Sequence, residues 1–317
     1  MKMCEKNRKV TIIGAGAVGS TYAYALAQAG LADEIVLTDF HADLAKGQAM
    51  DLVQGVPFMS PMTIKAGDDA DFADSDLIVI TAGAKQAPGE TRIDLLKRNA
   101  GIIRDTMSRI AASGCEGIVL LVTNPVDILT HVAIEASGWD RSRIFGSGTV
   151  LDTARFRYAI SRETKVDARN VHGYILGEHG DSEFPAWSLT TVAGMSFEAY
   201  CKQSGTCSDC GEAMRQAIEE EVRSSAYHII DYKGATNYAV GMALTRISGA
   251  ILRDEGSILS VSVALDGEYG LHGVCLSVPA IVGRQGIRKI LHAPLPEPEL
   301  ERLLESGNRL LQAQNSL

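Results

Sequence analysis

The loop at residues 83–98 is the stretch of this sequence with the clearest capacity for chemistry. It follows the apolar run Leu77–Ile80 and leads into a helical pattern, so it leaves the carboxyl end of a buried strand, where open α/β sheets bind ligands. Arg92 is a strong cationic donor that could polarise a substrate when the loop closes, and Pro88-Gly89 provides a turn and hinge. Gln86 is a neutral donor and acceptor. The charge at position 86 should therefore decide which substrates fit.

A second chemical site is predicted at a glycine-rich turn. Gly14, Gly16 and Gly19 form a GxGxxG pattern directly after the apolar run Val10–Ile13 and before a helical pattern. The first glycine permits a tight turn, the second lets the backbone approach a pyrophosphate, and the third allows close helix–strand packing. The helix start then offers free N–H groups to phosphates. In this context the motif predicts a dinucleotide site, whereas alone it could be a flexible turn.

Asp39 ends the second apolar run, 20 residues after Gly19. Its carboxylate can accept hydrogen bonds from ribose hydroxyls and would repel a 2′-phosphate, which favours NAD over NADP. The next residue, Phe40, is not basic and therefore also suits NAD. Val18 should lie against the cofactor near the turn.

Three further segments carry polar residues at positions that could form a site. Asn124 follows the run Ile118–Val122, at the carboxyl end of another strand. Asp152 and Arg155 are three residues apart, which places them on one face of a helix. His179 lies between glycine residues in a loop. Taken singly, Asp152 could be a helix cap and His179 a structural histidine.

The first half of the chain alternates short apolar runs with helical patterns. This alternation predicts a doubly wound parallel sheet of the Rossmann type, covered by helices on both faces. Strands are expected at Val10–Ile13, Ile35–Leu37, Leu77–Ile80 and Ile118–Val122, and helices at Val18–Ala29, Asp43–Val53 and Leu95–Ile110.

The pattern changes near residue 147. We expect a NAD-binding domain over residues 1–147 and an α+β substrate domain over 148–317. In the second domain, helices are expected at Leu151–Arg162, Ala213–Ile230, Ala235–Leu252 and Glu297–Leu311, and strands at Tyr174–Ile175, Ser188–Val192, Ile258–Leu265 and Gly273–Val282. The last two strands should pair antiparallel, with Asp266-Gly267 at the turn.

The charge and hydrophobic composition of the chain argue against two classes of binding partner, nucleic acids and membranes. The formal charge is 30 − 39 = −9, which argues against nucleic acid held on a basic surface. The charged N-terminus lacks a signal-type apolar core, and no window reaches the ~18 apolar residues of a membrane span. We therefore expect a cytoplasmic protein without a membrane partner.

Six cysteines in 317 residues do not form a dense framework, so reduced thiols are expected. Three of them lie close together: Cys201, Cys207 and Cys210. The CxxC spacing of the last two is typical of half a zinc site, but no second CxxC or nearby histidine completes it. We expect an exposed loop with incidental thiols and no metal, with redox sensitivity as the alternative.

Together these motifs resemble the lactate/malate dehydrogenase family, and within it the bacterial L-lactate dehydrogenases. The resemblance spans nearly the whole chain, in order and at similar spacing. It implies reversible hydride transfer between NADH and pyruvate, giving L-lactate and NAD, as the last step of fermentative glycolysis.

The resemblance implies a role for each matched residue. His179 is the general acid and base that exchanges a proton with the substrate oxygen, and Asp152 holds its other ring nitrogen. Arg155 clamps the substrate carboxylate, while Arg92 polarises the ketone. Asn124 donates to the reacting oxygen and precedes a cis proline bond. Further expected contacts are Thr236 in the substrate pocket and, around the cofactor, Gly83, Ala84, Val122, Thr123, Asn124, Ser147 and Val240.

Position 86 separates the two main activities within this family. Malate dehydrogenases of the family carry an arginine there, which pairs with the second carboxylate of oxaloacetate. Gln86 leaves such a carboxylate without a counterion, at a cost of several kcal/mol, on the order of a hundredfold in specificity. The resemblance therefore favours pyruvate, with malate dehydrogenase as the alternative.

Arg157 and His172 match positions that form a fructose 1,6-bisphosphate site between subunits in bacterial relatives. The resemblance therefore implies activation by this diphosphate and assembly as a homotetramer. The alternative is an ordinary surface arginine and a structural histidine. A protein of another class, a non-enzymatic NAD-binding redox sensor, would have no reason to keep the acid–base pair and both arginines.

Overall fold

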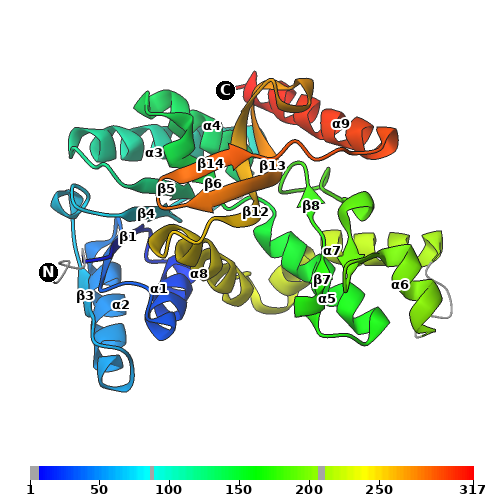
Figure 1. Cartoon of the computed structure of the whole chain (residues 1–317). Helices are drawn as coiled ribbons and strands as arrows, with labels where there is room; N and C mark the ends of the chain where they lie inside the picture. Colours follow the sequence, from blue (N-terminus) through cyan, green and yellow to red (C-terminus); the bar gives the residue numbers. More distant parts are fainter. Residues whose placement is uncertain (1–6, 86–88, 206–210) are drawn as a thin grey trace, which may run out of the picture.

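The computed structural model describes residues 7–85, 89–205 and 211–317. Its centre is a nine-stranded sheet with helices on both faces (Figure 1). Within the described ranges, no helix is both long and apolar enough to cross a membrane. The strands of this sheet are β1 (Lys9–Ile13), β2 (Glu34–Thr38), β3 (Thr63–Ala66), β4 (Leu77–Ile80), β5 (Ile118–Leu121), β6 (Ile144–Gly146), β12 (Ser257–Asp266), β13 (His272–Gly283) and β14 (Gly286–Ile290).

The strand order across the sheet is β14-β13-β12-β6-β5-β4-β1-β2-β3. The chain first moves outward from β1 to β2 and β3, and then continues on the other side through β4, β5 and β6, all paired in parallel. This confirms the doubly wound fold predicted from the sequence. Strands β1, β4 and β5 are buried along their whole length, as expected for strands covered on both faces.

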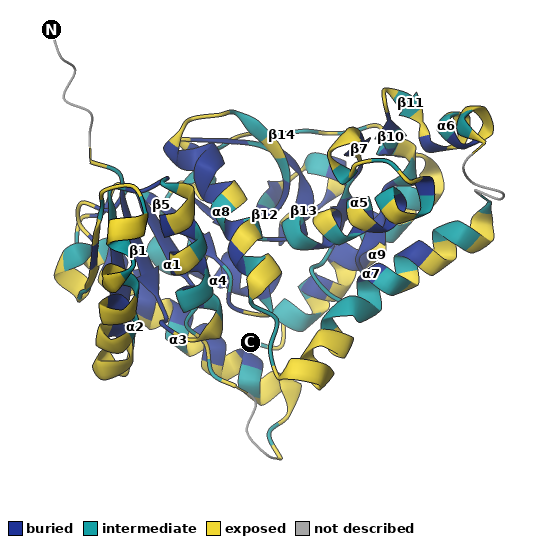
Figure 2. Ribbon diagram, turned by 90° about the horizontal axis from the view of Figure 1, so that it is seen from below, coloured by how far each residue is buried: buried dark blue, intermediate teal, exposed yellow. Residues whose placement is uncertain are grey.

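The helices that cover the sheet lie in two layers (Figure 1). One layer contains α1 (Ala17–Ala29), α2 (Ala42–Gln54) and α8 (Tyr238–Leu252). The other contains α3 (Arg92–Ala112), α4 (Val126–Ser137) and α9 (Glu297–Gln314). Figure 2 shows the buried residues gathered along the sheet and on the inner sides of these helices.

Two parallel strands, β3 and β6, were not among the expected ones. Strand β3 is at the edge of the sheet, and its Thr63 and Lys65 are exposed, so it lacks the apolar run of a central strand. Strand β6 is only three residues long, although all three are buried. Neither strand offers the length or pattern that identifies a buried strand in a sequence.

The strands of the C-terminal half extend the N-terminal sheet. Strand β12 pairs antiparallel with β6 through Ser262 and Gly146, and β12 and β13 form the expected antiparallel pair. The Asp266-Gly267 turn is longer than expected, because a 3₁₀ turn, η6 (Glu268–Gly270), follows it. This extension joins the two halves of the chain through hydrogen-bonded backbone.

The remaining elements form a smaller lobe with its own core. They are α5 (Val150–Thr164), β7 (Val171–His172), β8 (Ile175–Leu176), β9 (Phe184–Pro185), η5 (Trp187–Leu189), β10 (Thr191–Val192), β11 (Met195–Ser196), α6 (Phe197–Ser204) and α7 (Glu212–Lys233). The expected strand Ser188–Val192 is wrong in its first half, because Ser188 belongs to η5. The core of the lobe consists of Phe156, Ala159, Ile160, Val171, Ile175, Val192, Phe197, Cys201, Ile218 and Val222.

The cysteines differ in part from the expectation of reduced thiols. Cys201, on α6, is disulfide-bonded, whereas Cys115 and Cys275 are free and buried. Cys207 and Cys210 lie outside the described residues.

Candidate active site

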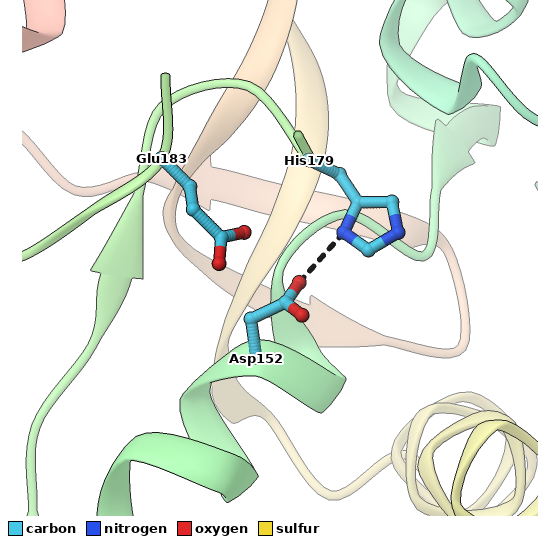
Figure 3. A group of neighbouring side chains, drawn as sticks. All are labelled: Asp152, His179 and Glu183. Carbon is cyan, nitrogen blue, oxygen red and sulfur yellow. Dashed lines mark hydrogen bonds and ion pairs between the residues drawn. The ribbon is translucent and has the colours of Figure 1, made fainter. Parts of the chain in front are cut away.

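An acid–base pair lies where the small lobe meets the sheet. Nδ1 of His179, in the loop between β8 and β9, is 2.6 Å from Oδ2 of Asp152 (Figure 3). Asp152 is in the first turn of α5 and is buried. Because Nδ1 is occupied by the carboxylate, Nε2 is the ring nitrogen that remains for a substrate. The structure thus brings together two residues that lie 27 positions apart in the sequence, separated by most of α5 and by β7 and β8.

Arg155, on the same face of α5 as Asp152, binds the second oxygen of the Asp152 carboxylate. Its Nη1 donates to Oδ1 of Asp152 at 2.8 Å, so the two oxygens of that carboxylate are divided between an imidazole and a guanidinium. Arg155 is mostly buried, and a guanidinium has five N–H donors. The remaining donors can bind a carboxylate in a bidentate pair.

The charges of the pair stabilise each other. Burial alone would lower the pKa of His179, but the charge and hydrogen bond of Asp152 outweigh it and raise this pKa to about 9. Burial alone would raise the pKa of Asp152, but His179 and Arg155 outweigh it and hold this pKa below its usual range. At neutral pH the imidazole therefore carries a proton that it can donate.

A buried aspartate, whose role the sequence analysis missed, fixes the histidine loop. Oδ2 of Asp127, on α4, accepts the backbone N–H of His179 at 2.8 Å, and its Oδ1 accepts the hydroxyl of Ser262 at 2.6 Å. Burial raises the pKa of Asp127 to about 6. A charged residue inside the apolar helical segment 126–134 was the available signal, because a buried carboxylate needs partners.

Arg92 lies at the start of α3, which Thr91 caps by accepting the N–H of Asp94. Its side chain is exposed. The hydrogen bond to Asp181 is the main cause that raises the pKa of Tyr227 on α7. The positive charge of Arg92 acts on the same phenol and lowers its pKa. The phenol donates that bond at 2.7 Å. The start of α3 therefore lies near α7 and the histidine loop, while Gln86 and Pro88 lie outside the described residues.

Two other predicted substrate residues lie in connections around the site. The Asn124–Pro125 peptide bond is cis, and the backbone oxygen of Asn124 accepts a hydrogen bond from Asn99. Thr236 is half-buried between α7 and α8. Its neighbour Asn237 donates to Thr21 on α1 at 2.8 Å, which ties this connection to the glycine-rich turn.

The glycine-rich turn has room for a pyrophosphate. A Cβ at Gly14, whose φ is +106°, would lie 2.6 Å from a backbone nitrogen, and one at Gly19 would lie 1.9 Å from the carbonyl oxygen of Gly14. A Cβ at Gly16 would meet nothing within 4 Å. Gly16 is also the N-cap of α1 and provides no side-chain cap, so the helix start opens into free space. These residues fit a dinucleotide phosphate.

Asp39 lies beside this turn at the end of β2. Its Oδ2 accepts the N–H of Ala15 at 2.7 Å, and its Oδ1 accepts the N–H of His41 at 2.8 Å. Each carboxylate oxygen can accept a further hydrogen bond, so ribose hydroxyls can still bind. Phe40 is 97% exposed and places no positive charge there.

The other predicted cofactor contacts share one edge of the sheet. Gly83 and Ala84 follow β4, Val122 and Thr123 follow β5, and Ser147 follows β6, all at carboxyl ends. Asn99 on α3, which the sequence analysis missed, accepts the N–H of Ala84 at 2.9 Å. Val18 and Val240 are partly buried against the main core.

Arg157 and His172 lie apart from the acid–base pair. Nε and Nη2 of Arg157 donate to the carbonyl of Gly173 at 3.2 and 3.1 Å, and its guanidinium lies 5.7 Å from the ring centroid of Tyr174. His172 is exposed on β7. The two basic residues therefore flank one short segment of the small lobe.

The combination of a dinucleotide turn with a protonated histidine and a guanidinium that can hold a carboxylate defines a nicotinamide-dependent dehydrogenase. Comparison with known families makes this class more specific. The model of the lactate/malate dehydrogenase NAD-binding domain matches residues 8–146, and that of the alpha/beta C-terminal domain matches residues 149–316. The chain belongs to the lactate/malate dehydrogenase family, and NAD is its cofactor.

Individual relatives agree along the full length. The L-lactate dehydrogenase of Treponema denticola is 63% identical over 311 residues, covering 98% of both chains. That of Acetivibrio thermocellus is 53% identical over 96% of this chain and 95% of the relative. Among solved structures, a lactate dehydrogenase from a Medee basin deep-sea metagenome has a TM-score of 0.95 at 44% identity, covering 98% of this chain and 99% of that one. The minor L-lactate dehydrogenase of Enterococcus mundtii, in its ligand-bound form, has the same TM-score at 41% identity, covering 99% of each.

Proposed function

We propose that this protein is an L-lactate dehydrogenase that interconverts pyruvate and L-lactate with NADH and NAD, in the cytoplasm, as the last step of fermentative glycolysis. The observation that carries this proposal is the group formed by His179, Asp152 and Arg155 in a chain that also has the dinucleotide turn. The names of the closely similar relatives support it. The division into a NAD-binding domain, residues 1–147, and a substrate domain, residues 148–317, belongs to the same proposal.

Arg155, His179 and Asp152 have different roles in the reaction. Arg155 binds the carboxylate of pyruvate and thereby orients the ketone toward Nε2 of His179. When bound, NADH would supply the hydride that the carbonyl carbon accepts. His179 gives its proton to the carbonyl oxygen, and Asp152 holds the imidazole in the orientation and tautomer that this transfer needs. In lactate oxidation the neutral histidine takes the proton back.

Two further donors act on the same oxygen. Arg92, at the start of α3, polarises the carbonyl, and Asn124 donates to it from the end of β5. Thr236 lines the pocket from the connection between α7 and α8.

The choice of pyruvate over oxaloacetate rests on the residue type at position 86. Gln86 is neutral, so a second substrate carboxylate would be enclosed without a counterion. The test compares kcat/KM for pyruvate and oxaloacetate with NADH. We expect pyruvate to be preferred by about a hundredfold or more. A preference for oxaloacetate would make the protein a malate dehydrogenase.

Self-association as a homotetramer is part of the proposal. Large apolar side chains are exposed in two regions, and apolar surface of this kind is typical of interfaces. The first region is α2 with the turn η1 (Val56–Phe58), and the second is the end of α7 with the start of α8. The exposed residues are Leu44, Met50, Val53 and Phe58 in the first region, and Ile229, Ile230, Tyr232, Tyr238 and Met242 in the second.

Activation by fructose 1,6-bisphosphate is proposed at Arg157 and His172. Repeated around a two-fold axis, this basic pair would gather four positive groups whose repulsion the diphosphate relieves. We expect the diphosphate to lower the KM for pyruvate and to favour the assembled form in sedimentation. Arg157→Gln should remove both effects. No response of the wild-type enzyme at low protein concentration would refute this part.

A further inference from the structure

Glu183 is a third titratable residue beside the acid–base pair. It precedes β9 in the histidine loop, and its side chain points toward Asp152 (Figure 3). Glu183 is only 6% exposed. One carboxylate oxygen of Glu183, one of Asp152 and a ring nitrogen of His179 all lie within 4.8 Å of one another. The oxygens of Asp152 already pair with the guanidinium of Arg155 and the imidazole of His179, and these two cationic groups oppose the binding of a metal ion at the same carboxylate.

The charges that act on Glu183 come from three directions. Asp152 and Arg155 are on α5, His179 is in the same loop, and Arg223 is on α7. Arg223 uses its terminal nitrogens to bind Glu219 and Glu220, while its Nε is buried without a partner. Within the described residues, no hydrogen bond to the carboxyl group of Glu183 is found. Its ionisation is therefore controlled by its burial and by the surrounding charges.

We propose that Glu183 is a positioning residue for the acid–base step: its ionised carboxylate strengthens the hold of His179 on the proton, and it becomes neutral after His179 has given that proton to the substrate. This inference rests on the proposed function, because it takes His179 as the acid and base. The proton that Glu183 takes up comes from solvent, and it is released again when His179 is reprotonated. The overall stoichiometry of the reaction is unchanged.

The electrostatics of the cluster support this exchange. With His179 protonated, a cation lies beside two carboxylates. With His179 neutral, the carboxylates of Asp152 and Glu183 face each other, and two such groups at this separation in a buried site cannot both stay ionised. Burial and the charge of Asp152 raise the pKa of Glu183 well above its usual range, whereas the charges of His179, Arg155 and Arg223 lower it. The charge of Asp127, on α4, also raises the pKa of His179. Asp127 accepts a hydrogen bond from the backbone N–H of His179.

The test replaces the carboxyl group by a neutral amide of the same shape. In Glu183→Gln we expect the pKa of the His179 imidazole to fall by about one pH unit, or roughly tenfold in proton affinity, because a negative charge ~5 Å away is lost. Nuclear magnetic resonance of the labelled histidine rings in the NADH complex measures this pKa without turnover. The pH profile of kcat/KM for pyruvate should move by the same amount.

Two variants complete the experiment. Glu183→Asp keeps the charge and should retain most of the wild-type pKa, whereas Glu183→Leu also removes the charge and serves as the test if the glutamine variant does not fold. Glu299→Gln is the matched control, because Glu299 binds Ser188 on the following segment and lies outside the cluster. An unchanged His179 pKa in Glu183→Gln would overturn the inference. An enzyme that does not reduce pyruvate would instead overturn the proposed function, and the resonance measurement separates the two failures.

Discussion

Asp152 shows how one residue can serve two tasks through its two oxygens. Oδ2 binds the imidazole of His179, and Oδ1 binds the guanidinium of Arg155. The carboxylate therefore couples the group that moves a proton to the group that holds the substrate. Asp152 is buried in the first turn of α5, and a movement of its side chain would disturb both groups at once.

The raised pKa of His179 depends on the negative charge of Asp152. In Asp152→Asn the favourable charge is lost, so the pKa of the histidine should fall from about 9 toward its ordinary value near 6.5. Because pyruvate reduction needs the protonated form, kcat/KM should decline at correspondingly lower pH in this variant. The pH profile of kcat/KM measures the shift. A decline at the same pH in both proteins would show that another group controls it.

The same pKa has a consequence for stability. The folded state binds the histidine proton more tightly than the unfolded state, because its pKa is raised. The stabilisation by this ion pair is therefore complete below pH about 6.5 and is lost as the pH rises through about 9. Unfolding by urea at several pH values should show this loss, and it should be absent from Asp152→Asn.

Some residues of the site could be predicted from the sequence and others could not. His179, Asp152 and Arg155 stood out because their types and spacing carry chemistry. Asp127 and Glu183 did not, because their importance depends on neighbours in space. The bond from His179 to Asp127 crosses 52 residues of sequence, and an acidic residue acquires a special role only when folding buries it beside another charge.

In the turn between β1 and α1, two glycines have different roles. Gly19 is required for packing, because a Cβ there would lie 1.9 Å from a backbone oxygen, whereas Gly16 faces open space. We expect Gly16→Ala to fold normally and to raise the Kd for NADH roughly tenfold or more, since the methyl group occupies the phosphate position. Gly19→Ala should instead destabilise the protein by ~3 kcal/mol or more.

Fluorescence titration with NADH and urea unfolding distinguish these two glycine variants. Each variant is the control for the other, because both add one methyl group to the same turn. Tight NADH binding by a stable Gly16→Ala would show that the pyrophosphate does not lie against this residue.

The elements themselves were predictable to different degrees. Fully buried strands have continuous apolar runs, and the predicted bounds match the structure for β4 and differ by one residue for β1 and β5. The edge strand β3 carries exposed polar residues, and the short strand β6 has no pattern of its own. Ser188 was expected in a strand, but its segment forms a 3₁₀ turn, since short segments of the small lobe are shaped by tertiary contacts.

At the scale of the whole molecule, the continuous sheet matters most for the site. Strand β12 extends the N-terminal sheet through β6, and Ser262 on β12 binds Asp127, which in turn binds the backbone of His179. The histidine loop of the small lobe is thereby fixed to the sheet that carries the cofactor end. Local patterns cannot predict such a join, because it pairs residues more than a hundred positions apart.

The substrate of this enzyme is decided by its kcat/KM for pyruvate and for oxaloacetate, measured on the purified protein with NADH at pH 7. A site with His179, Asp152 and Arg155 but a neutral residue at position 86 predicts efficient pyruvate reduction, about a hundredfold or more above oxaloacetate. Turnover of oxaloacetate at an equal or higher kcat/KM, or reduction of neither acid, would contradict the account.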